Sequence, residues 1–384
     1  MPGSPPRILF SAGEASGELY AAELLRHLRR SHPEVEAVGL GGDRLAGQGA
    51  RLLFHIRDLA VMGLVEVLRH LRRLRGIFAA VLAEVDRQRP DLAVLVDYPD
   101  FNLRLARELH RRGVPVVYYV SPQLWAWRRG RMRQIQAHVR RMLVLFPFEE
   151  PLYREAGVPV TFVGHPLVDL VEPPRDREAF LSEAGLDPER PVLAVLPGSR
   201  PGEIAHNLPV LADTLRLLRG RRPDVQPLLA QAPALEPQLL RPHLAGLDVA
   251  TVAGHSTAVL GAAQAALVAS GTATVETALV GTPMAVVYRV SPLSYFLGRR
   301  FVSVSHFAMV NLIAGREVVR ELIQRDFTPE RVLQEALRLL EDGPYAERMR
   351  ADLAEVRARL GQPGASARAA EAVAAELRSA RGES

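Results

Sequence analysis

Short apolar runs alternate with helix-like segments along most of this chain, and the alternation occurs in two blocks. In the first block the apolar runs are residues 8–10, 35–40, 92–96, 114–120 and 141–145. In the second block they are residues 192–196, 226–230, 249–253, 265–269 and 284–288. Apolar runs of this length between helices are typical of parallel strands that are buried on both faces. The sequence therefore predicts an α/β fold with two Rossmann-like, doubly wound domains.

The boundary between the domains is predicted within residues 166–190, which contain several prolines and lack a clear apolar period. A chain of 384 residues also exceeds what one hydrophobic core usually serves. We predict an N-terminal domain over residues 1–165 and a C-terminal domain over residues 166–344. The helical segment 345–384 is expected to pack back on the first domain. The two domains are expected to face each other, with the ligand in the cleft between them.

Composition excludes some classes of protein and favours others. The chain has no cysteine, which excludes disulfides, thiolate catalysis and cysteine-ligated metal sites. Its net charge of +5 comes from arginine, because no lysine occurs, and it favours acidic partners. No signal-peptide pattern is recognised, and the uncharged run 256–275 is interrupted by glycines and polar residues, as a strand and turn would be. We therefore expect a cytoplasmic protein without a membrane-spanning helix.

Two loops that follow predicted strands have the composition of anion-binding turns. The first contains Gly198, Ser199 and Arg200; its backbone N–H groups would face a diphosphate, and the arginine would neutralise a phosphoryl leaving group. The second follows the strand at residues 265–269. Its candidate ligand-binding residues are Ser270, Gly271, Thr272, Thr274 and Glu276. The glutamate would accept hydrogen bonds from ribose hydroxyls. The alternative for each loop is ordinary helix capping, but two such loops in one half of the chain indicate a nucleotide-sugar site.

Asp97 is the candidate catalytic base. It ends the apolar run 92–96, where a parallel sheet presents its chemistry, and a carboxylate there can take a proton from an alcohol. The alternative role in this segment, a helix N-cap, is assigned to Asp100. A glycine-rich turn after the first strand, with Gly13, Glu14 and Ser16, lacks the spacing of a dinucleotide fingerprint. Its alternative is a tight turn with the serine as helix cap.

Residues 61–75 form a basic amphipathic pattern, with apolar residues at helical spacing and arginines at 69, 72, 73 and 75. The candidate lipid-facing residues are Met62, Val65, Leu68 and Leu71. The alternative is a helix packed on the core with a solvated arginine face. Residues 125–131 and 295–301 also mix aromatic residues with arginine, and three such patches favour an anionic membrane surface.

Several functional classes lose support because their motifs are missing. The sequence contains no D-x-D, no H-E-x-x-H and no P-loop with its lysine, so we predict neither a metal ion nor a cofactor. Nothing resembles a dedicated nucleic-acid-binding signature, so nucleic acid is not an expected partner.

A set of motifs in order along the chain resembles those of the lipid-A-disaccharide synthase family. They are G-E-A-S-G-E at 13–18, V-M-G-L-V-E-V at 61–67, D-Y-P-D-F-N at 97–102, Y-V-S-P at 119–122 with W-A-W at 125–127, F-V-G-H-P at 162–166, L-P-G-S-R at 196–200 and N-L-I-A-G-R-E at 311–317. The resemblance extends over nearly the whole chain. Before the asparagine the family usually has Ser-Leu-Pro, where this chain has Ala308, Met309 and Val310.

The resemblance implies an inverting, metal-independent glycosyltransferase of the GT-B fold, peripheral to the inner face of the cytoplasmic membrane. Its substrates would be UDP-2,3-diacylglucosamine and 2,3-diacylglucosamine 1-phosphate, joined as a β(1→6) disaccharide with release of UDP. The first domain would then bind the acceptor, through Gly13, Glu14 and Ser16 among others, and the second would bind the UDP-sugar. The resemblance assigns catalytic roles to Asp97, Arg200 and Asn311.

Two alternatives remain beside this interpretation. One is another GT-B transferase that uses a UDP-sugar and a different lipid acceptor, and the other is a membrane-bound UDP-sugar binder without catalytic activity. A homodimer is a further expectation.

Overall fold

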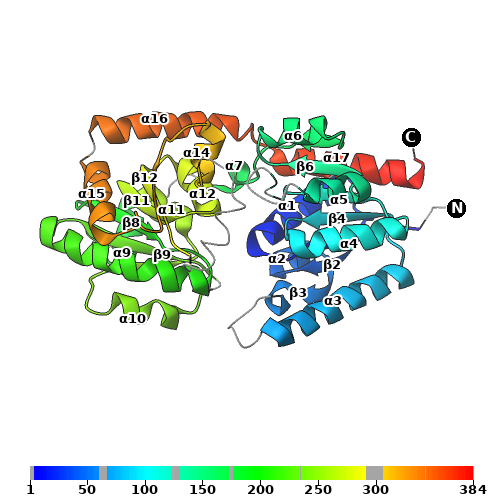
Figure 1. The fold of residues 1–384 in the computed structure, drawn as a ribbon, viewed down its shortest axis with the longest axis horizontal. Coiled ribbons are helices and arrows are strands. Elements are labelled where there is room, and N and C mark those ends of the chain that lie inside the picture. Colours follow the sequence, from blue (N-terminus) through cyan, green and yellow to red (C-terminus); the bar gives the residue numbers. More distant parts are fainter. Residues whose placement is uncertain are drawn as a thin grey trace. The chain divides into compact units, whose positions relative to one another are not determined.

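The computed structural model describes residues 4–59, 67–122, 124, 130–172, 176–233, 235–290, 306–341 and 343–383, with side chains from residue 72 onward in the helix that begins at 67. It contains two compact units. The first consists of Met1–Pro166 with Gly361–Ser384, and the second of Leu167–Leu360 (Figure 1). Each is an α/β unit built on one parallel sheet.

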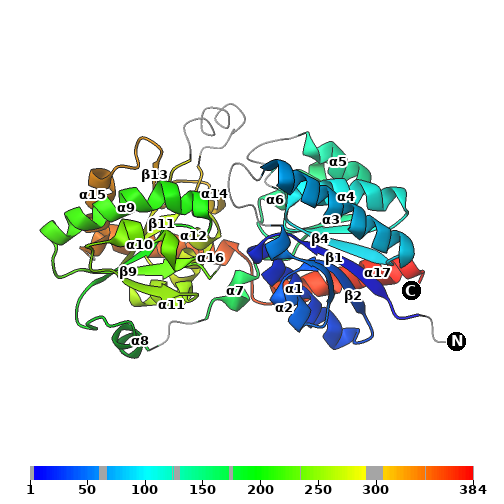
Figure 2. The ribbon, with the colours of Figure 1, turned by 90° about the horizontal axis from the view of Figure 1, so that it is seen from below.

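The sheet of the first unit has the strand order β3-β2-β1-β4-β5-β6-β7. Its strands are β1 (Arg7–Ala12), β2 (Glu36–Gly41), β3 (Arg51–His55), β4 (Leu92–Val96), β5 (Val116–Tyr119), β6 (Arg141–Val144) and β7 (Val160–Phe162). Its helices are α1 (Ala15–Ser31), α2 (Asp43–Gly47), the 3-10 turn η1 (Ile56–Asp58), α3 (Val67–Arg87), α4 (Pro99–Arg111), α5 (Arg131–His138), α6 (Glu149–Glu155) and α17 (Ala365–Arg381). Figure 2 shows α3, α4 and α5 on one face of the sheet and α1, α2 and α17 on the other.

The sheet of the second unit has the strand order β10-β9-β8-β11-β12-β13. Its strands are β8 (Val192–Leu196), β9 (Gln226–Gln231), β10 (Ala250–Ala253), β11 (Ala265–Ala269), β12 (Met284–Tyr288) and β13 (Arg320–Ile323). Its helices are α7 (Leu167–Leu170), α8 (Arg177–Glu183), α9 (Pro201–Arg221), the 3-10 turn η2 (Pro237–Leu239), α10 (Arg241–Leu244), α11 (Ser256–Ala262), α12 (Thr272–Val280), α14 (Met309–Ala314), α15 (Pro329–Leu340) and α16 (Pro344–Arg359). The central strands β8 and β11 are buried throughout, as expected for strands covered on both faces.

Each sheet reverses its strand order at one point. In the first unit β1 pairs with β2 on one side and with β4 on the other. In the second unit β8 pairs with β9 and with β11 in the same way. Loops that leave the two strands at such a point diverge to opposite faces of the sheet and leave a crevice at the carboxyl ends of the strands. The predicted α/β class with two doubly wound sheets is confirmed, and the ends of β1, β4, β8 and β11 are where ligand-binding residues are expected.

The C-terminal segment 345–384 divides between the two units. Helix α16 contacts α12, α14 and α15 within the second unit, so the expected return of residues 345–360 to the first unit is wrong. Helix α17 does return and packs along α1. The chain turns at Gly361, which has a φ of 96° and would bring a Cβ to 3.2 Å from the Cα of Gly164. Glycine therefore permits this crossing.

A buried carboxylate fastens α17 to the sheet of the first unit. The side chain of Glu376 is 8% exposed and accepts hydrogen bonds from Nε of Arg141 and pairs with Nε of Arg140, each at 2.6 Å. Arg368 adds a hydrogen bond from its Nε to the carbonyl oxygen of Val163. The two ion pairs join α17 to the segment that begins β6.

Replacing Glu376 by alanine is expected to weaken the docking of α17. The loss of two charge-assisted hydrogen bonds, partly offset because both arginines can reach water, is expected to cost about 2 kcal/mol. Hydrogen–deuterium exchange of residues 365–381 should then quicken by about 30-fold, because this is the change in the opening equilibrium. Glu371→Ala removes an exposed glutamate from the same helix and should leave the exchange unchanged. Equal exchange in the two variants would contradict the prediction.

Helix α3 shows how the basic amphipathic pattern packs where its side chains are described. Ile77, Val81 and Val85 are buried in the core of the first unit, and Leu74 packs against it. Arg72 and Arg75 are exposed. From residue 72 onward the helix therefore follows the alternative interpretation, a core-packed helix with a solvated arginine face. In the described part of the chain, no helix is both long and apolar enough to cross a membrane.

Candidate active site

Asp97 follows β4 at the point where the first sheet reverses its order, and its backbone is held in a strained conformation. Both Asp97 and Tyr98 have a φ of 49°, in the left-handed region that side-chain-bearing residues rarely adopt. The N–H of Asp97 donates to the carbonyl oxygen of Tyr119 at 2.9 Å. Its carbonyl oxygen accepts from Nδ2 of Asn102 and from the hydroxyl of Tyr118, each at 2.7 Å. These three hydrogen bonds hold the turn in place, and such support from the surrounding structure is what allows a strained backbone conformation to persist.

Asn102 is a residue of the site whose role was missed from the sequence, although it ends the D-Y-P-D-F-N motif. It is fully buried on α4, and its Nδ2 also lies 3.2 Å from the carbonyl oxygens of Ser11 and Val96. Its Oδ1 accepts from the hydroxyl of Ser11 at 2.6 Å. One amide therefore joins the ends of β1 and β4. Asp100 is not the N-cap of α4, because Tyr98 is; it lies in the first turn and pairs with Arg131.

The glycine turn after β1 lies against the Asp97 turn. A Cβ at Gly13 would meet the ring of Tyr98 at 2.4 Å, so only glycine allows this approach. A Cβ at Gly17 would lie 3.7 Å from the Cβ of Asp97. Glu14 is the N-cap residue of α1, and Ser16 lies inside the first turn, so the cap role considered for the serine is wrong. Burial raises the pKa of Tyr98, and the negative charges of Glu14 and Asp100 raise it further.

The first predicted anion loop, Pro197 to Arg200, is engaged by its own helix. Gly198 has a φ of 126°, and the N–H groups of Ser199 and Arg200 donate to Oε2 of Glu203 at 2.8 and 3.3 Å. The expectation that these N–H groups would be presented to a ligand is therefore wrong in this structure. The side chain of Arg200 is 63% exposed.

The second predicted anion loop is open at the start of α12. Gly271 has a φ of 149°, and both it and Thr272 are exposed. Thr274 is fully buried, and its hydroxyl donates to the carbonyl oxygen of Gly271 at 2.8 Å, so it holds the turn of this loop. Because β8 and β11 are neighbours, this loop and the first one leave adjacent strand ends.

Glu276 lies one turn further along α12 and has a partner that the sequence did not indicate. The hydroxyl of Ser256, the first residue of α11, donates to its Oε2 at 2.8 Å. Burial raises the pKa of Glu276, and the hydrogen bond from Ser256 opposes that shift without cancelling it. The carboxyl group is thus held at the edge of the open loop in a partly desolvated position.

Glu276→Gln is expected to raise the thermal stability of the free chain at neutral pH. Because the pKa of Glu276 is raised on folding, its stabilising contribution is present at low pH and is lost as the pH rises through the folded-state pKa. The glutamine carries no such penalty, so its Tm should exceed that of the wild type at pH 8 and match it at pH 4. Glu236→Gln, an exposed site in the same unit, is the control. A Tm difference that does not change with pH would contradict the prediction.

Asn311 is fully buried on α14, and the catalytic role predicted for it does not fit its surroundings. Its Oδ1 accepts from the N–H groups of Val318 and Val319 at 2.8 and 3.0 Å. Its Nδ2 donates to the carbonyl oxygen of Val319 at 2.9 Å and to Oε1 of Glu321 at 2.8 Å. All four hydrogen-bonding positions of the amide are used inside the chain. Asn311 therefore shapes its loop through these contacts.

The loop before Asn311 connects this amide to the open anion loop. Glu321 accepts from the N–H groups of Phe307 and Ala308, at 2.9 and 3.0 Å, as well as from Asn311. The hydroxyl of Ser270 lies 3.3 Å from the carbonyl oxygen of Phe307. A chain of hydrogen bonds thus runs from Asn311 to the end of β11.

Some predicted residues cannot be placed. Met62 and Val65 lie outside the described residues, and Leu68 and Leu71 belong to the part of α3 where only the backbone is described. Within the patches at 125–131 and 295–301, residues 125–129 and all of the second patch also lie outside the described residues. The predicted lipid-facing surface stays a prediction.

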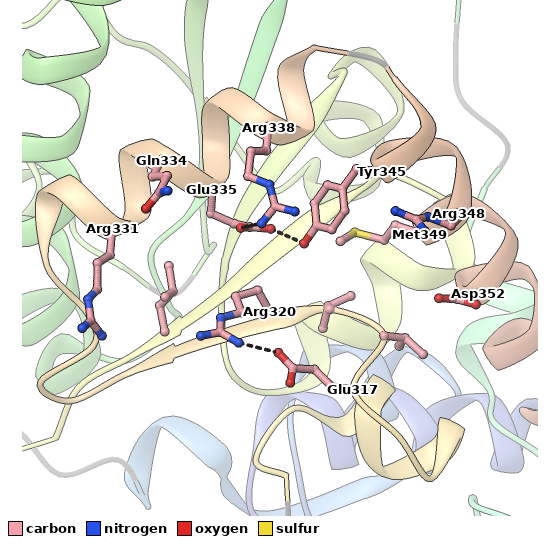
Figure 3. A pocket seen from close by; sticks show the side chains of 13 residues that line it. Glu317, Arg320, Arg331, Gln334, Glu335, Arg338, Tyr345, Arg348, Met349 and Asp352 are labelled. Atoms are coloured by element: carbon pink, nitrogen blue, oxygen red, sulfur yellow. Dashed lines mark hydrogen bonds and ion pairs between the residues drawn. The ribbon is translucent and has the colours of Figure 1, made fainter.

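Two pockets formed by the described residues lie away from Asp97 and from the two predicted anion loops. A pocket of about 760 Å³ lies beside β13, between α15 and α16, and is lined by charged side chains, among them Arg320, Glu335 and Arg338 (Figure 3). Arg320 pairs with Glu317 at 3.2 Å, and Arg338 pairs with Glu335 at 3.3 Å and covers the ring of Tyr345. Among the described residues, no group of His, Asp and Glu side chains could hold a metal ion.

Comparison with known proteins gives the same family over most of the chain. The family model for lipid-A-disaccharide synthetase matches residues 8–376. The lipid-A-disaccharide synthase of Myxococcus xanthus is 47% identical over 372 residues, covering 96% of this chain and 97% of that protein. That of Koribacter versatilis is 48% identical, with the same coverage of both chains.

Solved structures of low sequence identity share the fold. The glycosyltransferase of kitacinnamycin has a TM-score of 0.62 at 19% identity, covering 97% of this chain and 99% of that one. The UDP-GlcNAc 2-epimerase of Neisseria meningitidis, bound to UDP-GlcNAc, has a TM-score of 0.64 at 11% identity with the same coverage. These neighbours support the GT-B fold predicted from the sequence. The family model and the close relatives together establish that the chain belongs to the lipid-A-disaccharide synthase family of glycosyltransferases.

Proposed function

We propose that this chain transfers 2,3-diacylglucosamine from UDP-2,3-diacylglucosamine to the 6-hydroxyl of 2,3-diacylglucosamine 1-phosphate, with inversion at the anomeric carbon. The products are the β(1→6) disaccharide 1-phosphate and UDP. Family membership supports the reaction. The observation that carries the mechanism is the Asp97 turn. Its carboxylate lies on a strained backbone, which two hydrogen bonds to the carbonyl oxygen of Asp97 hold in place, where the first sheet reverses its strand order.

The proposed chemistry needs a base for the acceptor and positive charge for the leaving group. The 6-hydroxyl oxygen forms a bond to C1 of the donor sugar while its proton passes to Asp97. The bond between C1 and the phosphate oxygen breaks, and UDP leaves with the electron pair. Arg200 and the open N-terminus of α12 stabilise the charge that develops on the diphosphate. The acceptor residues belong to the first unit and the donor residues to the second.

Glu276 is proposed to accept hydrogen bonds from the ribose hydroxyls of the donor. Its position one turn into α12, beside the exposed Gly271 and Thr272, supports this role. The variant Glu276→Gln should bind UDP about 10-fold more weakly, because a charged carboxylate that accepts at both oxygens becomes a neutral amide that accepts at one oxygen, and hydrogen bonds to a charged acceptor are stronger. Such a variant would trade stability against affinity.

The same proposal includes a location and partners. Substrates with acyl chains favour an enzyme that works peripherally on the inner face of the cytoplasmic membrane, and arginine-rich apolar patches favour an anionic surface. Sedimentation with vesicles of phosphatidylglycerol, compared with vesicles of phosphatidylcholine alone, tests this attachment. A homodimer stays part of the proposal, and analytical ultracentrifugation tests it.

The reaction itself is tested by mass spectrometry of lipids after incubation of the purified chain with both substrates in detergent. The disaccharide 1-phosphate should form together with an equal amount of UDP. An acceptor in which the 6-hydroxyl is replaced by hydrogen is the matched control and should give no disaccharide. UDP binding without disaccharide formation from the true acceptor would overturn the proposed acceptor while leaving the donor class intact.

A further inference from the structure

The loop Pro197–Arg200 is attached to helix α9 at both of its ends. At its beginning, the carbonyl oxygen of Pro197 accepts from Nδ2 of Asn207 at 3.0 Å. At its end, the N–H groups of Ser199 and Arg200 donate to Oε2 of Glu203 at 2.8 and 3.3 Å. Asn207 is fully buried, and its Oδ1 accepts from the N–H of Arg289 after β12, also at 3.0 Å. The loop is thus fixed to its own helix, and the helix is fixed to the sheet.

Glycine at position 198 is what allows Glu203 to reach the loop. A Cβ at Gly198 would lie 2.6 Å from both Cβ and Oε2 of Glu203, and the φ of 126° is one that other residues rarely adopt. The glycine of the L-P-G-S-R motif therefore makes room for a carboxylate of this chain.

The arrangement separates the roles of Glu203 and Arg200. The side chain of Glu203 is 16% exposed and lies beneath the loop, whereas that of Arg200 is 63% exposed. Nη1 of Arg200 and Oε1 of Glu203 are 3.8 Å apart, which is an ion-pair distance and longer than a hydrogen bond. The N–H groups of Ser199 and Arg200 are used inside the chain, so the guanidinium of Arg200 is the group that this loop would offer to a diphosphate.

We propose that Glu203 is a positioning residue for the sugar-nucleotide donor. Its carboxylate holds Ser199 and Arg200 by their backbone N–H groups and so fixes the point from which the guanidinium of Arg200 reaches the diphosphate. The inference rests on the proposed function, because it takes the donor to be a UDP-sugar. A loop that is shaped before the donor arrives spends no binding energy on ordering itself.

Two conservative variants separate the hydrogen bonds of Glu203 from its charge. Both N–H groups donate to the same oxygen, Oε2, so the single carbonyl oxygen of Glu203→Gln can accept both while the charge is removed. Glu203→Asp keeps the charge, but its carboxylate falls short by about 1.5 Å, one carbon–carbon bond. We expect kcat/KM for the donor to stay within about 3-fold of the wild type in the glutamine variant and to fall by about 10-fold in the aspartate variant. The KM for the acceptor should not change in either.

Isothermal titration with UDP alone gives a readout that does not depend on the acceptor. The Kd for UDP should rise by about 10-fold in Glu203→Asp and stay within about 3-fold in Glu203→Gln. If the wild type binds UDP but makes no disaccharide, the proposed reaction fails, and this titration still decides the role of Glu203. Asp213→Asn, which removes an exposed carboxylate from the same helix, is the control and should leave both Kd and kcat/KM unchanged.

Three results would overturn the proposal. An aspartate variant with wild-type kcat/KM and Kd would show that the two hydrogen bonds to the carboxylate of Glu203 are not needed. A glutamine variant that falls as far as the aspartate variant would show that the charge, and not the hydrogen bonds, is what matters. A loss of Tm alone, with kcat/KM unchanged in the folded protein, would make the role merely structural. Gly198→Ala should displace Glu203 and lower kcat/KM as far as Glu203→Asp does. The double variant Gly198→Ala with Glu203→Asp should lose no more kcat/KM than either single variant.

Discussion

Asp97→Asn is expected to lower kcat for disaccharide formation by about 1,000-fold while the Kd for UDP stays near that of the wild type. The amide cannot take the proton of the acceptor hydroxyl, and the residues proposed to bind the donor lie in the other unit of the chain. The fold should be unaffected, because asparagine tolerates a φ of 49° better than most residues do. The contacts made by the backbone of residue 97 remain available.

The measurement is single-turnover formation of the lipid disaccharide, with UDP binding followed in parallel. Asp100→Asn is the matched control, because that side chain is 72% exposed in the same motif. It should retain activity within about 3-fold, as expected for an exposed ion pair. An Asp97 variant that keeps wild-type kcat would remove Asp97 from the chemistry, and loss of UDP binding in that variant would indicate a disturbed fold.

Asn311→Asp is expected to destabilise the second unit by about 3 kcal/mol or more. The new carboxylate oxygen would replace an amide nitrogen that lies 2.8 Å from Oε1 of Glu321 and 2.9 Å from the carbonyl oxygen of Val319. Two hydrogen-bond acceptors, the new oxygen and either neighbouring oxygen, would then face each other at a fully buried position. The loss of stability should shrink as the pH falls, because protonation of the new carboxyl group removes its negative charge and restores a hydrogen-bond donor at this position.

Thermal unfolding of the variant across pH 4 to 8 measures this effect. Gln334→Glu adds the same charge at an exposed position of the same unit and should shift the Tm by little. A residue that acted on the substrate would give the opposite pattern, with Tm preserved and kcat lost. That result would restore the catalytic role that the sequence motif implied for Asn311.

Sequence patterns predicted every strand in the interior of each sheet and one edge strand, β10. β4, β8, β11 and β12 begin and end at the predicted residues. The strands that were missed, β3, β7 and β13, are edge strands. An edge strand is half exposed, so its side chains need not be continuously apolar: β13 reads Arg-Glu-Leu-Ile, and none of β7 is fully buried. The missing signal follows from the position of these strands in the sheet.

For the candidate site, the sequence predicted which strand ends matter but not what each side chain contacts. Asp97 and the Gly271 loop could be found because each directly follows an apolar strand. The roles of Asn102, Glu203 and Ser256 depend on hydrogen bonds across turns of the chain, which no spacing reveals. Asn311 was predicted from its place in a motif, and the motif did not reveal that its amide is buried in contacts with its own loop.

The return of α17 to the first unit affects the order in which the protein can fold during its synthesis. The second unit is one continuous stretch, Leu167–Leu360, whereas the first unit needs Gly361–Ser384 to be complete. Domains usually finish folding in the order in which they leave the ribosome, N-terminal first. Here the second unit is expected to finish first, while the first sheet waits for the helix that packs along α1. Emergence of α17 from the ribosome is therefore the event that commits the N-terminal domain, and with it the Asp97 turn, to the native state.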